Sequence, residues 1–412
     1  MGIWNVGWAA SADQYLEGSP VDRFVFSALL VLGLGVLLTR LPQVIKVLRA
    51  NPAIIVFYFY CALSTLWSDF PDVAFKRWTK LLTDLVMVLV VVTDRDPTRA
   101  IKRLFSRVVF FLIPLSILFI RYYPELGRVY TRWEGALLNT GVTTDKNTFG
   151  MICMMSGLVA LWRLLTSGQE AQAMRKRSRV AYGAILLMAI WLLWQADSAT
   201  STTCFLMMGI LLVLVSLPKL IRRRAVLHVI VFSMLTSCIL ALFVAPALLV
   251  LIGRNPTLTG RTIIWQNVLS LDSSPIFGAG FESFWLGSRL ETLWRMFPGD
   301  GRFHPNEAHN GYIEIYLSLG AVGLAILVFL ILSGYRHLTA TVLHNRASHA
   351  LRLGFCVGAI AYNFTEAAFK ELHPLWICFL WAIIAIPEGR GAKKLIPPKV
   401  EHWDLSLAEA RP

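Results

Sequence analysis

The feature that most constrains this chain is a series of apolar blocks separated by short polar segments. A backbone inside lipid must satisfy its own polar groups, so long apolar blocks favour membrane-spanning helices, whereas a barrel would show short alternating segments. Several blocks are shorter than the ~20 residues of a full span, so we expect their helices to extend into flanking polar residues. The blocks fall at about residues 24–38, 53–67, 79–93, 108–120, 148–165, 181–195, 204–217, 226–252, 311–332, 353–369 and 374–387.

This pattern predicts an all-α polytopic membrane protein with about 11 transmembrane helices, within a range of about 10 to 12. The last two blocks form either two spans or one re-entrant hairpin. Composition agrees, because 56% of the residues are hydrophobic and only 16% are charged, against roughly 45–50% and 25% in soluble domains. The six cysteines all lie in apolar blocks without paired spacing, which predicts neither disulfides nor a zinc site.

The distribution of basic residues predicts how the chain is oriented. The net charge of +14 would suit a nucleic-acid-binding protein, but the Lys and Arg residues fall in short loops, so topology explains them and no nucleic acid is expected. One alternating set of loops, which includes the C-terminal tail, holds 25 Lys and Arg residues, and the other set holds 14. The richer set is expected in the cytoplasm, with the N-terminus in the periplasm. An acidic leader argues against a cleaved signal peptide.

These expectations divide a bacterial inner-membrane protein into four parts. Residues 1–253 hold the first eight transmembrane helices, and residues 254–310 form one large periplasmic loop that carries part of a site. Residues 311–387 hold the C-terminal transmembrane helices, and residues 388–412 form a cytoplasmic tail.

Three segments on the predicted outer side combine cations, aromatic residues and glycines. Arg presents a planar fork of donors that matches phosphate oxygens, so arginines gathered at a membrane surface suit a lipid-linked pyrophosphate. Ordinary solvated loop charge is the alternative for most of them. The segments contain Trp67-Ser-Asp-Phe-Pro71 with Lys76-Arg77, then Arg132-Trp-Glu-Gly135 with Lys146-Asn147-Thr-Phe-Gly150, and finally Gly260-Arg261-Thr-Ile-Ile-Trp265, Pro275-Ile-Phe-Gly278-Ala-Gly280 and His309-Asn310-Gly-Tyr-Ile-Glu314.

These segments resemble the O-antigen ligase/Wzy polymerase superfamily of membrane glycan transferases. The patterns GRxxxW, PxFGxGxxSF and HNxxxxxxxxxGxxG occur in the family's order, and WSxxP, KNxxG and Asn363-Phe-Thr-Glu366 match as well. The resemblance covers about residues 55–385 and favours the ExoQ-like exopolysaccharide polymerase branch through RWEGALLNTGVTTDKNTFG. Asp145 stands where the family usually has His before Lys-Asn, so we assign no role to that position.

The resemblance implies transfer of a sugar chain or repeat unit from undecaprenyl pyrophosphate to an acceptor hydroxyl at the periplasmic face, without a metal or other cofactor. His309 then matches the family's histidine and suits general-base chemistry, with His304 as its local competitor. Arg261 matches the loop arginine that neutralises developing charge. The residues expected in substrate binding are Arg77, Arg132, Lys146, Asn147, Asn310, Trp265 and Glu366. A structural hydrogen bond between helices explains Glu366 equally well.

Three functions remain open on these grounds. The first is a polymerase that joins lipid-linked repeat units, which the ExoQ-like segment favours. The second is a ligase that transfers a finished chain to lipid A–core. The third is a transporter of polysaccharide or lipid-linked sugar, although transporters often contain internal repeats and none is evident here. The expected partners are the lipid-linked donor, a glycan or lipid A–core acceptor, membrane lipid and other polysaccharide-assembly proteins.

Overall fold

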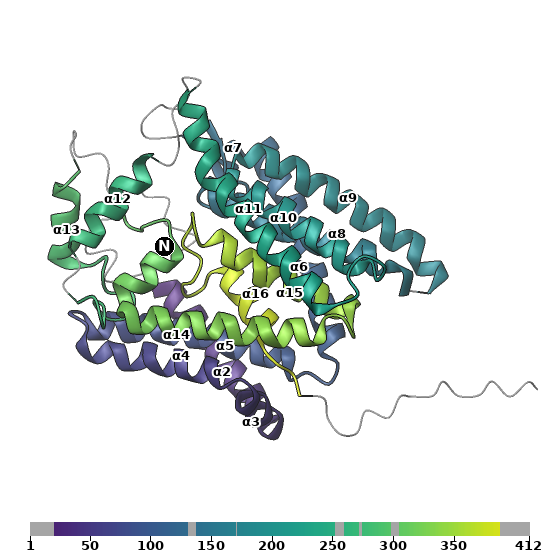
Figure 1. The fold of residues 1–412 in the computed structure, drawn as a ribbon, viewed down its shortest axis with the longest axis horizontal. Coiled ribbons are helices and arrows are strands. Elements are labelled where there is room, and N and C mark those ends of the chain that lie inside the picture. Colours follow the sequence, from purple (N-terminus) through teal and green to yellow (C-terminus); the bar gives the residue numbers. More distant parts are fainter. Residues whose placement is uncertain are drawn as a thin grey trace, which may run out of the picture.

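The computed structural model describes residues 20–130, 137–169, 171–251, 259–271, 274–297 and 305–387. Within these ranges the regular secondary structure is helical apart from one two-stranded hairpin (Figure 1). The elements of the first half are α2 (Pro20–Leu38), α3 (Leu41–Ala50), α4 (Pro52–Leu63), η1 (Ser64–Trp67), α5 (Pro71–Val92), α6 (Pro97–Tyr122), α7 (Pro124–Gly127), β1 (Arg128–Tyr130), β2 (Leu137–Asn139), α8 (Lys146–Thr166), η2 (Ser167–Gln169) and α9 (Gln172–Ala196). The second half contains α10 (Ala199–Ser216), α11 (Arg224–Leu251), α12 (Thr259–Ser270), α13 (Gly287–Arg295), α14 (Gly311–Thr341), α15 (Arg346–Tyr362) and α16 (Pro374–Ile383).

The predicted fold class, an all-α polytopic membrane protein, is confirmed. Every predicted apolar block contains a helix, and seven helices of the described chain are long and apolar enough to cross a membrane: α2, α6, α8, α9, α10, α11 and α14. The number rises to eight if α3 and α4, which meet at 92°, count as one broken span. The predicted count of about 11 is therefore not reached by length and composition.

Figure 1 shows how the helices are arranged. Helices α2, α4, α5 and α14 lie along one side of the bundle, α8 to α11 lie along the other, and α15 and α16 lie between them. Helices α12 and α13 lie beyond one end of the bundle, beside the start of α14. We call this the site end; it also carries η1, the β1–β2 hairpin and residues 363–373. The far end is called the opposite end.

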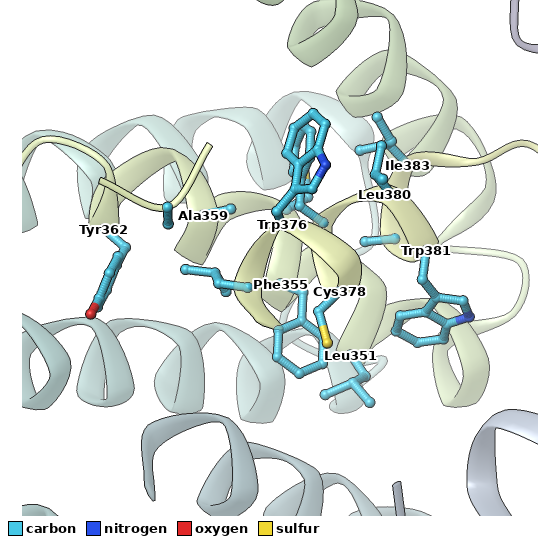
Figure 2. Close-up of a cluster of buried hydrophobic side chains, with 14 of the residues drawn as sticks. Leu351, Phe355, Ala359, Tyr362, Trp376, Cys378, Leu380, Trp381 and Ile383 are labelled. Atoms are coloured by element: carbon cyan, nitrogen blue, oxygen red, sulfur yellow. The ribbon is translucent and has the colours of Figure 1, made fainter. Parts of the chain in front are cut away.

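The core of the bundle lies where α15 meets α16 (Figure 2). Phe355 of α15 and Trp381 of α16 meet edge to face, with ring centroids 6.3 Å apart. Trp376 stacks on Phe379 with centroids 5.5 Å apart. All four side chains are buried, and such aromatic pairs add about 0.5–1.5 kcal/mol each beyond the area they bury.

Helix α16 has only 10 residues, which rise about 15 Å, or half of the hydrocarbon thickness. Its last carbonyls are satisfied by Arg352, which donates from Nε to Ala382 O at 2.9 Å and from Nη2 to Trp381 O at 3.2 Å and to Ile384 O. The chain then continues without helix. There Asn51, at the bend between α3 and α4, accepts from the Ala385 N–H at 2.8 Å and donates to the Ala385 carbonyl at 2.9 Å.

The loop that precedes α13 is hydrogen-bonded to α14 at a break in that helix. Gly320 has φ 66° inside the helix, and the freed Ala321 and Val322 N–H groups donate to Pro275 O and Ile276 O at 2.8 and 3.2 Å. A Cβ on Gly320 would lie 2.2 Å from Ile276 O, and one on Gly278 would lie 2.5 Å from Gly320 N. The two backbones therefore touch directly, with no side chain between them.

Candidate active site

The N-terminus of α14 is joined to the segment that follows α15. Asn310 caps α14, since its Oδ1 accepts from Tyr312 N and Ile313 N at 3.0 and 3.1 Å, while its Nδ2 donates to Phe364 O. Gly311 N donates to Asn363 O at 2.9 Å and to Glu366 O at 3.1 Å. A Cβ at Gly311 would lie 1.9 Å from Asn363 Oδ1. This close approach brings residues 309 and 366 together from segments far apart in the sequence.

Asn363 shapes the segment after α15. Its buried Oδ1 accepts from Ala368 N and Phe369 N at 2.8 and 3.0 Å, which folds the backbone into a turn. The predicted span 353–369 therefore ends earlier, at Tyr362, because the amide side chain offers the backbone an alternative to helix. The turn directs Glu366 and Lys370 toward the start of α14.

His309 lies between two carboxylates. Its Nδ1 is 2.9 Å from Glu307 Oε1 and 3.4 Å from Glu366 Oε2. The residue has φ 49°, a left-handed conformation that His tolerates better than most side chains do. Nδ1 is buried, yet one third of the side chain is exposed. The exposed part of the ring therefore lies away from the carboxylates.

A cation accompanies each carboxylate on its other oxygen. Arg261 Nη2 of α12 lies 2.7 Å from Glu366 Oε1, and Lys370 Nζ lies 2.7 Å from Glu307 Oε2. The five side chains thus form an alternating chain of charge, in the order Lys370, Glu307, His309, Glu366 and Arg261. Alternation satisfies each group that is withdrawn from water.

The protonation of this chain follows from its neighbours. Burial lowers the pKa of His309, but Glu307 and Glu366 outweigh burial and raise that pKa to about 9. Burial raises the pKa of Glu307, yet Lys370 and His309 bring it well below its ordinary value. Burial lowers the pKa of Lys370, and Glu307 more than reverses this. At neutral pH the resting His309 is therefore mostly an imidazolium.

A cavity of about 550 Å³ opens beside His309. Its walls come from the β1–β2 hairpin, the start of α8 and the segments on either side of His309 and Glu366. A second histidine, His373, lines the same space, and burial together with Lys370 lowers its pKa to about 3. The lining residues include Val129, Tyr130, Leu138, Asp145, Lys146, Asn147, Glu307, His309, Glu366, Lys370 and His373.

The start of α8 forms another part of the cavity wall. Asp145 caps this helix, since its Oδ1 accepts from Asn147 N at 2.9 Å and from Thr148 N at 2.8 Å. Lys146 Nζ lies 3.9 Å from Asp197 Oδ2. The predicted residues Lys146 and Asn147 thus line the same cavity as His309 and Glu366, next to a helix N-terminus that favours anions.

Other predicted site residues lie outside the cavity lining. Arg77 of α5 donates to the backbone carbonyl of Glu282. Trp265 of α12 donates from Nε1 to Ala308 O at 2.7 Å, and Asn310 is engaged in the helix cap. These three side chains contact backbone that supports the site. Arg132 and His304 lie outside the described residues.

Glu307, Lys370 and His373 are not among the site residues predicted from the sequence. Glu307 lies two residues before His309, a spacing that could have drawn attention to it. Lys370 and His373 carried no local signal, because the turn at Asn363 is what brings them to the cavity. By distance alone Glu307, His309 and Glu366 could hold a metal ion, but Lys370 and Arg261 already balance the two carboxylates.

The fold and site define a multi-pass membrane protein with a charged cavity at one end of its bundle. The family model described as O-antigen ligase matches residues 171–328. The exopolysaccharide production protein ExoQ of Rhizobium meliloti is 24% identical over 360 residues, which cover 84% of this chain and 79% of ExoQ. A provisionally named polysaccharide ligase of Rickettsia typhi is 25% identical over 212 residues, which cover 50% of this chain and 52% of the relative.

These matches show that the chain is similar to proteins of the O-antigen ligase and ExoQ-like superfamily. They support a ligase-type or polymerase-type role in the membrane.

Proposed function

We propose that this protein is a membrane glycan polymerase that joins lipid-linked repeat units during exopolysaccharide or O-antigen biosynthesis. The observation that carries the proposal is the meeting of His309, Glu366 and Arg261 beside the cavity that Lys146 and Asn147 line. The donor is an oligosaccharide on undecaprenyl pyrophosphate, and the acceptor is a sugar hydroxyl. The similarity to ExoQ over most of both chains favours polymerase over ligase.

In the proposed step, the acceptor hydroxyl oxygen bonds to the anomeric carbon of the donor sugar. The bond from that carbon to the pyrophosphate oxygen breaks, and its electron pair remains on the pyrophosphate. The neutral form of His309, which is the minor form at neutral pH, takes the hydroxyl proton and later releases it to water. Glu307 and Glu366 stabilise the imidazolium that forms, as a carboxylate does in a Ser-His-Asp triad.

The departing pyrophosphate needs positive charge, which Arg261 and Lys146 supply in this scheme. Arg261 then shares its donors between Glu366 and the phosphate oxygens. The cations Arg261 and Lys370 also offset the carboxylates that would otherwise attract a divalent ion. The proposed reaction therefore proceeds without a metal.

The decisive experiment analyses the surface glycans and lipid carriers of a strain that lacks the protein. If the protein is a polymerase, long polysaccharide should disappear while single repeat units persist on the carrier. Complementation with His309→Ala should leave this defect in place at normal protein level, whereas His344→Ala, at the opposite end, should restore the polysaccharide. Normal glycans with His309→Ala would contradict the assigned site.

The second candidate is a ligase, which the O-antigen ligase family model favours. It predicts that long chains persist on the carrier but do not reach lipid A–core. If no lipid-linked glycan changes, transport becomes the better explanation.

We further propose that the protein lies in the bacterial inner membrane and that its site end faces the periplasm. The excess of basic residues in the opposite set of loops supports this orientation. The N-terminus then lies in the periplasm and the C-terminus in the cytoplasm, where other assembly proteins can reach the tail. Reporter fusions after residue 280 should be active in the periplasm and fusions after residue 175 in the cytoplasm. The reverse result would place the site on the wrong side for a periplasmic donor.

A further inference from the structure

Glu307 has a position that its neighbours fix from both sides. Its Oε2 is paired with Lys370 Nζ at 2.7 Å, and its Oε1 lies 2.9 Å from His309 Nδ1. Glu366 is farther from the same nitrogen, at 3.4 Å, and its nearer partner is Arg261 at 2.7 Å. Of the two carboxylates, Glu307 is thus the closer partner of the imidazole.

The backbone around Glu307 is held by contacts that do not involve the cavity. Glu314 of α14 accepts from the Ala308 N–H through one carboxylate oxygen and from Trp285 Nε1 through the other. The Ala308 carbonyl accepts from Trp265 Nε1. The peptide groups between Glu307 and His309 are therefore anchored on both faces, which sustains the left-handed conformation of His309.

The backbone that carries Lys370 is anchored separately. Asn363 holds Ala368 and Phe369 in its turn, and Asp84 of α5 accepts from Leu372 N at 2.8 Å. Lys370 is held between these two anchor points, and its ammonium reaches Glu307 across the segment boundary. The pair therefore adds a side-chain link between two segments that Asn310 and Gly311 also join through the backbone.

We propose that Glu307 is a positioning residue: held by Lys370, its carboxylate accepts a hydrogen bond from Nδ1–H of His309, and Nε2 is left as the atom that takes the acceptor proton. The inference rests on the proposed glycan transfer. A neutral imidazole has one donor and one acceptor nitrogen, and the partner of one nitrogen decides the tautomer. With Nδ1 buried between carboxylates, only Nε2 is free to accept a proton from the cavity.

Every charged group near the imidazole affects its protonation. Glu307 and Glu366 favour the imidazolium, while Lys370 and Arg261 reduce the negative charge of these carboxylates. Across the cavity lie Asp145 and Lys146 of the α8 start, and His373 is neutral at ordinary pH. Neutralising Glu307 removes the nearest anion, so the imidazole should release its proton at lower pH.

A direct test measures the proton on His309 without any substrate. Diethyl pyrocarbonate modifies neutral imidazoles, so peptide mapping of the purified full-length protein across pH 6–10 gives a titration curve for each histidine. In the wild type, His309 should become reactive with a midpoint near pH 9. Glu307→Gln should lower this midpoint by about one unit, whereas the matched control Glu291→Gln on α13 should leave it unchanged.

The same variants are then compared for glycan transfer with a synthetic lipid-pyrophosphate donor. Glu307→Gln should lower the turnover rate by about 10- to 100-fold, the size of effect seen when a partner that orients a metal-bound imidazole is lost. The rate should fall although more of the imidazole is neutral, because the tautomer is no longer fixed. The affinity for the donor should not fall, because Glu307 is an anion that lines the cavity and contributes no attraction to phosphate. Lys370→Met should act in the same direction, and Lys370→Arg should restore most of the rate.

The outcomes separate this inference from the proposed function. A wild-type midpoint near ~6.5, the ordinary value for histidine, would overturn the inference even if no variant folds. An unchanged midpoint in folded Glu307→Gln, with transfer still lost in His309→Ala, would overturn it while glycan transfer stands. A shifted midpoint in a protein that transfers no glycan from any lipid-linked donor would overturn the proposed function, and the inference that rests on it, while the Glu307–His309 contact stands.

Discussion

Two buried or nearly buried arginines lie toward opposite ends of the bundle and have different kinds of partner. Arg352 is 6% exposed and donates to three backbone carbonyls at the end of α16. The Arg261 side chain is 17% exposed and pairs with the carboxylate of Glu366, next to His309 and the cavity. The carbonyls that Arg352 caps are part of the fold itself, whereas Arg261 and Glu366 are side chains that another ligand can engage.

The partners of a buried arginine distinguish a structural role from a chemical one. A guanidinium satisfied by carbonyls stabilises the end of a short helix, and the one here is almost fully buried. A guanidinium paired with a carboxylate beside a histidine and an open volume has a partner that can be exchanged. Burial and residue type are alike in the two cases, so only the partners and the adjacent space distinguish them.

The largest effects are expected when each of these two arginines is replaced. Arg261→Ala should lower glycan transfer by about 10²–10³-fold, as removal of a charge-stabilising donor does elsewhere, with normal amounts of folded protein. Arg352→Met should instead lower the stability of the fold by about 3 kcal/mol or more, because it leaves carbonyls without donors. Transfer rate per folded molecule and the thermal midpoint in detergent measure the two effects. If Arg261→Ala unfolds the protein and Arg352→Met does not, the comparison fails.

A smaller effect is expected at the contact between the loop and α14. Gly320→Ala places a Cβ 2.2 Å from Ile276 O in a left-handed conformation, and should lower stability by about 1–3 kcal/mol. Gly35→Ala is the matched control, because its Cβ would meet nothing within 4 Å. Limited proteolysis of the loop before α13, compared between the two variants, reports whether the loop has separated from α14. Equal behaviour of both variants would mean that the contact is not structural.

The α8 cap should contribute less. Asp145→Ala removes the acceptor for Asn147 N and Thr148 N and should lower stability by about 1 kcal/mol. Asp145→Asn keeps an acceptor oxygen and should lower stability by less. Thermal midpoints of the two variants measure this difference. A large loss of transfer in Asp145→Asn at wild-type stability would indicate that the charge acts in the reaction, which the helix cap alone does not predict.

The smallest expected effect is that of metal removal. Because Lys370 and Arg261 offset the carboxylates that flank His309, treatment of the purified protein with a chelator should leave the transfer rate unchanged. Loss of activity that one divalent cation restores would show that Glu307, His309 and Glu366 hold a metal and would replace the charge assignments above.

Much of the fold follows from the sequence because lipid imposes a strict requirement on backbone polar groups. Each predicted apolar block contains a helix, but the number of helices long enough to span the membrane could not be predicted from the blocks. Helix α16 can stop after 10 residues because Arg352 and Asn51 satisfy backbone groups at and beyond its end. Those partners come from other parts of the chain, so the local hydropathy of the last apolar block does not predict them. The β1–β2 hairpin also escaped prediction, since three-residue strands carry little pattern.

The candidate site was predictable where the motifs themselves carry the side chains. His309, Glu366, Lys146 and Asn147 were predicted together, and all four line one cavity. Lys370 was not predicted, because it reaches Glu307 through the turn at Asn363 and 63 residues separate the pair. The support given by Asn310 and Trp265 to neighbouring backbone depends on contacts that residue identity alone does not specify.

The break in α14 has a consequence for the length of the chain. The helix is attached at Asn310 to Phe364 and at Gly320 to the Pro275–Phe277 backbone. One inserted residue between these attachments would turn one end relative to the other by about 100° and lengthen the helix by about 1.5 Å. Both attachments could not then form at once. Between positions 310 and 320, related proteins should therefore tolerate changes in side chain far better than insertions or deletions. The number of residues in this segment should vary less among relatives than the residue types do.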